Sequence, residues 1–77
     1  TYKLQRELDE LPGRIEHLEQ QVEELQNQIN NNDFYLQTYA QTQPVLDTLQ
    51  ALEVEIEEAI MRWSELEDMR DTLEHRT

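Results

Sequence analysis

Six Lys and Arg side chains are the groups in this sequence that point most directly to a partner, because they could bind phosphate. The stretch of residues 15–61 holds ten carboxylates and no Lys or Arg, and the net charge of the chain is −12. An anionic partner is therefore repelled except where the two end segments, 1–14 and 62–77, lie. The six cations are Lys3, Arg6, Arg14, Arg62, Arg70 and Arg76.

The same cations could instead pair with carboxylates of the chain itself. Exposed pairs of this kind contribute about 0–1 kcal/mol each. On charge patterning alone, such pairing is favoured over phosphate binding. The register described below predicts three pairs across the molecule, namely Arg14 with Glu57 or Glu58, Arg62 with Glu10, and Arg6 with Asp68.

No other residues form a recognisable catalytic or metal-binding pattern. His17 and His75 are isolated, and the residues three and four positions from His17 are not metal ligands. A single glycine, Gly13, excludes a glycine-rich phosphate loop, and the absence of cysteine excludes a disulfide framework. Ser64 and Thr48 have no histidine at helical spacing, so no nucleophilic site is predicted. The many glutamates are interpreted as a solvated face, and the chain itself is not predicted to be an enzyme.

Apolar residues spaced alternately by four and three positions predict the structure that carries these charges. Such spacing draws a narrow seam along a helix, which must be covered by a partner helix. Two seams occur and match one another in reverse order, so an all-α, antiparallel two-helix coiled-coil hairpin is predicted. The seam residues are Leu4, Leu8, Leu11, Ile15, Leu18, Val22, Leu25 and Ile29, facing Val45, Leu49, Leu52, Ile56, Ala59, Trp63 and Leu66.

Turn-forming and helix-breaking residues predict the boundaries of the two arms. Arm one is expected over residues 1–30, with a short N-terminal helix broken at Leu11-Pro12-Gly13, and the loop over 31–43. Arm two is expected over 44–74, starting at Pro44, although a capping box at Thr38 is an alternative start. Residues 34–36, Phe-Tyr-Leu, are interpreted as a cap on the seam, with a contact surface for a partner as the alternative.

Arm two has a wider apolar stripe than arm one, and its seam slips after Leu66. A step of four would place the next apolar residue at Arg70, but Met69 comes after three. The additional apolar residues could pack against another part of a larger protein or against a second copy of this chain. They are Leu46, Val54, Ile60, Met61 and Met69.

Several segments resemble the C-terminal coiled-coil domain of ABC-F ATPases. The segment 2–12, YKLQRELDELP, is distinctive of that domain, and residues 14–19, RIEHLE, continue it. The loop residues 33–35, DFY, and the segment 62–67, RWSELE, match the same pattern. The match extends over most of the chain, up to about Leu66.

The resemblance implies a role that composition does not reveal. The chain would be the C-terminal fragment of a cytoplasmic protein with two ATP-binding cassettes, which use ATP and Mg²⁺, and without a membrane domain. The fragment itself would hold no cofactor, and a chain that begins with Thr1 fits a piece of a longer protein. The hairpin would be an accessory domain that binds DNA or ribosomal RNA, with the cassettes as a further partner. Phosphate contacts carry over to Lys3, Arg6, Arg14 and Arg62, and Arg70 is added by position.

Two hypotheses follow from the sequence. The first is a nucleic-acid-binding or ribosome-binding accessory domain of an ABC-F ATPase. The second is a structural coiled coil that docks a partner helix or self-associates through the wide stripe of arm two. Salt dependence distinguishes them, because binding through phosphate contacts weakens as salt rises. No apolar run approaches the ~20 residues of a membrane-spanning helix, so no membrane contact is expected.

Overall fold

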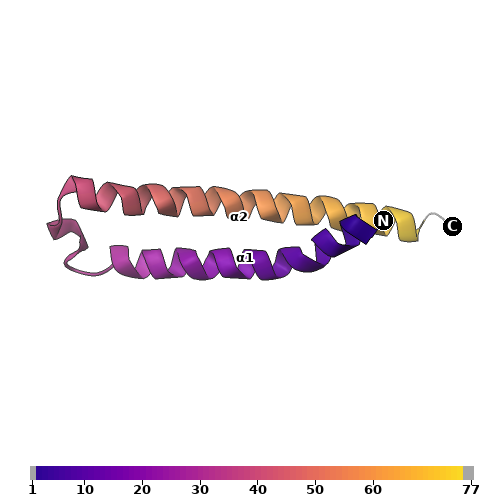
Figure 1. The fold of residues 1–77 in the computed structure, drawn as a ribbon, viewed down its shortest axis with the longest axis horizontal. Helices are drawn as coiled ribbons and strands as arrows, with labels where there is room; N and C mark the ends of the chain where they lie inside the picture. Colours follow the sequence, from indigo (N-terminus) through magenta and orange to yellow (C-terminus); the bar gives the residue numbers. More distant parts are fainter. Residues whose placement is uncertain (1, 76–77) are drawn as a thin grey trace.

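The computed structural model describes residues 2–75, which form two long helices joined by a short turn. Helix α1 covers Tyr2–Ile29, the 3-10 turn η1 covers Phe34–Leu36, and helix α2 covers Tyr39–Glu74. The long helices lie side by side and antiparallel in a rod of 62 × 17 × 15 Å (Figure 1). The predicted all-α helical hairpin is therefore confirmed.

The rod is divided here into three parts by residue range. We call the end that holds residues 2–14 and 62–75 the base, the turn at residues 30–38 the tip, and the length between them the shaft. All five candidate phosphate-binding residues lie in the base. Arg76, the sixth cation of the sequence, lies outside the described residues.

The interior of the hairpin is concentrated in the base and in the adjoining end of the shaft. Leu8, Leu11, Ala59 and Leu66 form one buried cluster, and Leu4 and Ile15 pack against it. Seam residues along the shaft beyond Leu18 are only half-buried on both helices. The seam is thus the contact that the sequence predicts, but its buried residues are gathered toward the base, and two helices cover the rest of it only in part. The half-buried residues are Val22, Leu25, Ile29, Val45, Leu49, Leu52 and Ile56.

Helix α1 continues through Leu11-Pro12-Gly13, where the sequence predicts a break. Proline in a helix removes one backbone hydrogen bond and costs about 3 kcal/mol. Leu11 stays buried against α2, and this packing holds the chain helical on both sides of Pro12. Figure 1 shows the first turns of α1 inclined toward α2, as expected for a helix bent at proline. The predicted break is therefore a bend inside one helix.

Helix α2 begins at Tyr39, five residues before the predicted start at Pro44. The alternative start is the one observed, because Thr38 and Gln41 form a capping box, in which the backbone N–H of Thr38 donates to Gln41 Oε1 at 3.4 Å. The capping box satisfies backbone groups that the first turn leaves free. Pro44 lies inside α2 and is exposed, and the predicted loop of 31–43 shortens accordingly.

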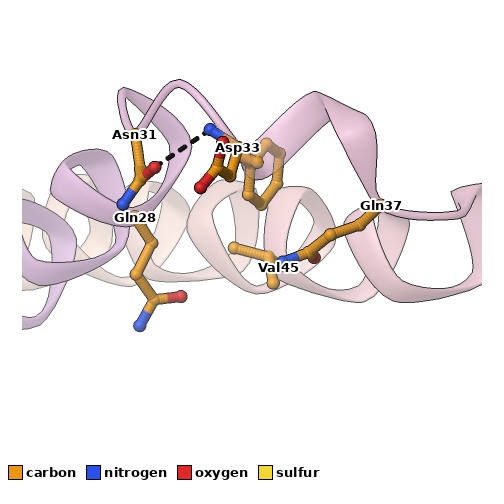
Figure 2. A pocket seen from close by; sticks show the side chains of 6 residues that line it. Gln28, Asn31, Asp33, Gln37 and Val45 are labelled. Carbon is orange, nitrogen blue, oxygen red and sulfur yellow. Dashed lines mark hydrogen bonds between the residues drawn. The ribbon is translucent and has the colours of Figure 1, made fainter.

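The tip combines a buried aromatic ring with exposed ones. Phe34 is buried and closes the end of the seam, so the cap interpretation is confirmed for this residue. Tyr35, which stacks edge-on against Phe34 at 4.9 Å between ring centroids, is exposed, as are Leu36 and Tyr39. Figure 2 shows the hollow beneath the turn, where the backbone N–H of Asp33 donates to Asn31 Oδ1 at 2.9 Å. These contacts fix the turn but bring no reactive groups together.

Candidate nucleic-acid interface

The five candidate residues divide into two groups by exposure. Lys3, Arg6 and Arg14 project from α1 and are exposed, whereas Arg62 and Arg70 on α2 are half-buried. The difference follows from helix position, because Arg62 precedes the seam residue Trp63 and Arg70 occupies a seam position itself. The two groups therefore have different neighbours.

Arg62 joins the two helices through Glu7. Its Nε donates to Glu7 Oε2 at 2.6 Å and its Nη2 to Glu7 Oε1 at 3.0 Å, a two-pronged contact that suits the planar guanidinium. The remaining nitrogen, Nη1, donates to Glu65 Oε2 at 3.0 Å on the same helix. The predicted pairing of Arg62 with Glu10 is wrong, because Arg62 contacts both carboxylate oxygens of Glu7, and Glu10 pairs with Arg6 instead.

The two partners of this ion pair change each other's acidity. The hydrogen bonds from Arg62 hold the pKa of the Glu7 carboxyl below its ordinary value, and partial desolvation opposes this shift without reversing it. Hydrogen bonds to Glu7 and Glu65 raise the pKa of Arg62, which stays charged at every pH of interest. The side chains are 38% and 39% exposed, so the pair is partly screened by water.

Arg70 explains the slip in the second seam. Its side chain lies among the apolar residues that close the base, where Nη2 donates to Glu67 on the same helix. Its Nε is buried and has no hydrogen-bond partner among residues 2–75. The stem of an arginine commonly packs along apolar surface in this way. The surrounding apolar residues are Leu4, Leu8, Leu66, Met69 and Leu73.

Lys3, Arg6 and Arg14 remain accessible to a partner. Arg6 pairs with Glu10 one turn away at 3.1 Å, and both side chains are 67% exposed, so the pair is weak. Lys3 and Arg14 make no ion pair among the described residues 2–75. Arg14 borders a small cleft that also includes Glu55 and Glu58, but no salt bridge forms. Cross-helix pairing, predicted for three arginines, occurs for Arg62 alone within the described chain.

Sequence reasoning missed Glu7, although a signal for it existed. Glu7 and Arg62 each directly precede a seam residue, Leu8 and Trp63, and such positions face one another across an antiparallel pair.

Within residues 2–75, no group of three or more His, Cys, Asp or Glu side chains could hold a metal ion. Neither described helix is long and apolar enough to cross a membrane. The exposed cations of the described chain thus lie in the base, beside the ion pair that joins the two helices.

Residues 1–68 match the sequence profile of the ABC transporter C-terminal domain family. The chain belongs to this family. The resemblance to the C-terminal coiled coil of ABC-F ATPases is thereby confirmed, and the matched range contains the positions of Lys3, Arg6, Arg14 and Arg62.

Relatives with this domain are ATP-binding proteins many times longer than the chain. The chain is 45% identical over 71 residues to the ATP-binding protein Uup of Escherichia coli (strain K12). It is 39% identical over 74 residues to the ATP-binding protein Uup of Haemophilus influenzae. These matches cover 92% and 96% of the chain but only 11% of each relative.

A solved structure has the same fold as the hairpin. It is the C-terminal domain of the Uup protein, which is described as a DNA-binding coiled coil motif. The two structures agree with a TM-score of 0.81 at 45% sequence identity, over 92% of this chain and 84% of the other. Identity at this level shows that the two-helix architecture is shared along nearly the whole rod.

Proposed function

We propose that this hairpin is an accessory DNA-binding domain of an ABC-type ATPase and that it contacts the DNA phosphates with its base. The observation that carries the proposal is its likeness, at 45% identity and a TM-score of 0.81, to a Uup domain described as DNA-binding. All exposed Lys and Arg side chains of the described chain lie in the base, and this supports the base as the surface that contacts DNA. The shaft, which has carboxylates and no Lys or Arg, would repel DNA.

The phosphate contacts are assigned to Lys3, Arg6 and Arg14. These residues lie on one flank of α1, over roughly 16 Å at 1.5 Å per residue. One DNA strand advances about 3.4 Å per nucleotide, so this length matches a few successive phosphates. Helix α1 thus holds the three side chains at fixed spacing while leaving each free to reach outward.

Arg62 and Arg70 are assigned a supporting role. Carboxylates already occupy the guanidinium of Arg62 on both sides, and Glu67 occupies that of Arg70. A phosphate would have to displace these carboxylates. In the proposed complex, Arg62 instead neutralises Glu7, which lies on the same flank of α1 as Lys3 and Arg14 and would otherwise repel DNA.

The expected binding is weak and strongly dependent on salt. Three phosphate contacts correspond to a slope of about −2.7 in a plot of log K against log salt concentration for duplex DNA. Phosphate contacts carry no sequence information, so little preference between DNA sequences is expected. Acidic neighbours such as Asp9 and Glu10 lower the affinity further.

The test is fluorescence anisotropy of a labelled 30-base-pair duplex with the full chain between 20 and 200 mM NaCl. Replacing Lys3, Arg6 and Arg14 together by Gln should reduce the affinity at least about tenfold and flatten the salt slope, since each lost contact removes about one unit. Circular dichroism should show unchanged helicity, because all three side chains are exposed.

A control variant separates local contacts from net charge. Replacing the exposed shaft residues Gln20, Gln26 and Gln50 by Glu changes the net charge by the same amount. The control should keep a salt slope near that of the unchanged chain. Equal losses in both variants, or no loss in the base variant, would refute the base as the contact surface.

The proposal also includes the longer protein to which the hairpin belongs and ribosomal RNA as an alternative to DNA. The matched relatives are named ATP-binding proteins, so the parent is proposed to be a cytoplasmic ATPase whose cassettes bind ATP and Mg²⁺ outside this chain. Ribosomal RNA offers the same phosphate chemistry as DNA. Competition between the labelled duplex and an A-form RNA hairpin of equal length decides between them, and stronger competition by RNA would favour a ribosomal target.

A further inference from the structure

An apolar groove runs between α1 and α2 beside the base. Its volume is about 390 Å³, which lies near the lower end of the range for ligand pockets. Its floor is apolar and comes from both helices, and its α1 wall carries two carboxylates. The lining residues are Pro12, Ile15, Glu16, Glu19, Ile60 and Trp63.

The floor of this groove is exposed although its residues are of a kind usually buried. Ile60 is 44% exposed and Trp63 is 37% exposed, whereas the adjacent seam residue Ala59 is buried. Tryptophan side chains in such positions often anchor protein partners. Pro12 lines the same groove on the α1 side, where its ring adds apolar surface and no hydrogen-bond donor.

The charge around the groove decides what could fill it. Glu16 and Glu19 form part of the wall, and no Lys or Arg occurs anywhere in residues 15–61. Two copies of this chain, meeting at their grooves, would bring these carboxylates together at close range. Like charges in an interface are unfavourable, so a second copy is disfavoured. A partner with cationic side chains beside an apolar stripe is complementary.

The shape of the groove adds a second requirement. Two helices that lie side by side present a long furrow into which a third helix can pack. Amphipathic helices enter such furrows with apolar residues at positions i, i+3, i+4 and i+7. We propose that the groove of Pro12, Ile15, Ile60 and Trp63 docks a cationic amphipathic helix of a partner protein, whose Lys or Arg side chains pair with Glu16 and Glu19.

This docking surface is separate from the proposed DNA contact. Arg14 borders the opposite side of α1, in the cleft that contains Glu55, Glu58 and Arg62. None of the groove residues is among Lys3, Arg6 and Arg14, so the hairpin could hold DNA and a protein helix at once. The two proposals can therefore fail independently.

The test uses the fluorescence of Trp63, which is the single tryptophan of the chain and lies in the groove. The probe is a synthetic helix of about 18 residues with Leu at i, i+3, i+4 and i+7 and Lys on either side, long enough to form helix on binding. Binding should shift the Trp63 emission to shorter wavelength as water leaves the indole. The same peptide with Glu in place of Lys should bind at least about tenfold more weakly.

Matched variants locate the site. Ile60→Glu should weaken binding of the Lys peptide at least about tenfold, since it buries an uncompensated charge in the contact. Met61→Glu makes the same change at the neighbouring position, which is 66% exposed and does not line the groove, and should leave binding within about twofold. Replacing Glu16 and Glu19 by Gln should weaken binding of the Lys peptide without altering the packing.

Three results would overturn the proposal. The first is equal affinity for the Lys and Glu peptides, and the second is equal loss in Ile60→Glu and Met61→Glu. The third is a dimer in sedimentation that Ile60→Glu converts to monomer, which would make a second copy the occupant. The triple Gln variant of Lys3, Arg6 and Arg14 should bind the Lys peptide at least as well as the unchanged chain. Loss of DNA binding by this triple variant would therefore say nothing against the docking of the peptide.

Discussion

The base and the shaft of the hairpin are built from the same repeat of apolar residues, yet they differ in packing and in charge. In the base, Leu8, Leu11 and Leu66 are buried, whereas Leu25 and Leu49 on the shaft stay half-buried. The base also carries the exposed cations and the one ion pair between the described helices, while the shaft carries carboxylates alone. A regular seam therefore sets the register of two helices along their whole length, but the stability that it provides depends on what surrounds it locally.

The sharpest way to test this comparison is to remove one leucine from each region. Leu66→Ala should lower the free energy of unfolding by about 3 kcal/mol, because the side chain is 2% exposed in a closed cluster. Leu25→Ala should lower it by about 1–2 kcal/mol, because water already reaches that side chain. Urea unfolding followed by circular dichroism measures both. Equal losses would mean that the seam is packed evenly and that the comparison is wrong.

The bend in α1 can be tested by restoring the missing backbone donor. Pro12→Ala should stabilise the hairpin by about 1–3 kcal/mol, because the helix regains a hydrogen bond and loses a steric conflict. Pro44→Ala makes the same exchange near the start of α2 and should have a smaller effect, since the ends of helices tolerate lost bonds better. Thermal melts compare the two variants. A destabilised Pro12→Ala chain would show that the bend itself is needed for packing in the base.

The ion pair of the base predicts a pH effect with a definite sign. The folded pKa of Glu7 lies below its unfolded value, so its contribution to stability is present above the unfolded pKa and is lost as pH falls through the folded pKa. A titration of the Glu7 carboxyl carbon by NMR should find this shift. Arg62→Met should return the pKa of Glu7 toward its ordinary value, whereas Glu65→Gln should leave most of the shift. An unshifted Glu7 in the unchanged chain would contradict the two-pronged contact.

The smallest expected effect concerns salt. Raising NaCl screens the repulsion among the shaft carboxylates and, to a lesser extent, weakens the pair of Glu7 and Arg62. Amide hydrogen exchange should therefore slow for shaft residues such as Leu25 and Leu49, by less than about 1 kcal/mol in opening free energy. Amides of Leu8 and Leu66 should change little or in the opposite direction. Uniform slowing along the rod would show that the base shares the electrostatic strain of the shaft.

Much of the architecture could be predicted because it follows from periodicity. The reversed seams establish two antiparallel helices and bring residues 1–14 beside 62–75, which places every candidate cation in one region. The boundaries were harder to predict, since the local rule for Pro12 takes no account of packing and the rules for Pro44 and for the capping box at Thr38 predict different starts of α2. Glu7 and Glu10 lie about one helical turn apart, and the contact of Arg62 with Glu7 could have been predicted from the position of both residues directly before seam residues.

The groove beside the base could be predicted only in part. Trp63 is a seam residue by spacing and is expected to be largely covered, whereas Ile60 belongs to the additional apolar residues for which the sequence predicts a contact outside the hairpin. Ile60 and Trp63 are exposed because two helices alone leave the outer side of their contact uncovered. Periodicity identifies which residues face the partner helix, but not how completely one partner covers them.

The long separation in sequence between Glu7 and Arg62, 55 positions, also bears on the order in which the chain folds. A hairpin that closes from its turn forms first the contacts near the tip and shaft, which are local but poorly packed. The loop that is closed when the base forms first is about two doublings longer than the loop closed at the tip. Forming the base contacts first therefore costs only about 1.2 kcal/mol more in chain entropy. Local opening of the tip therefore does not unfold the hairpin. The unfolding rate is governed by the opening of the buried cluster, which consists of Leu8, Leu11, Ala59 and Leu66.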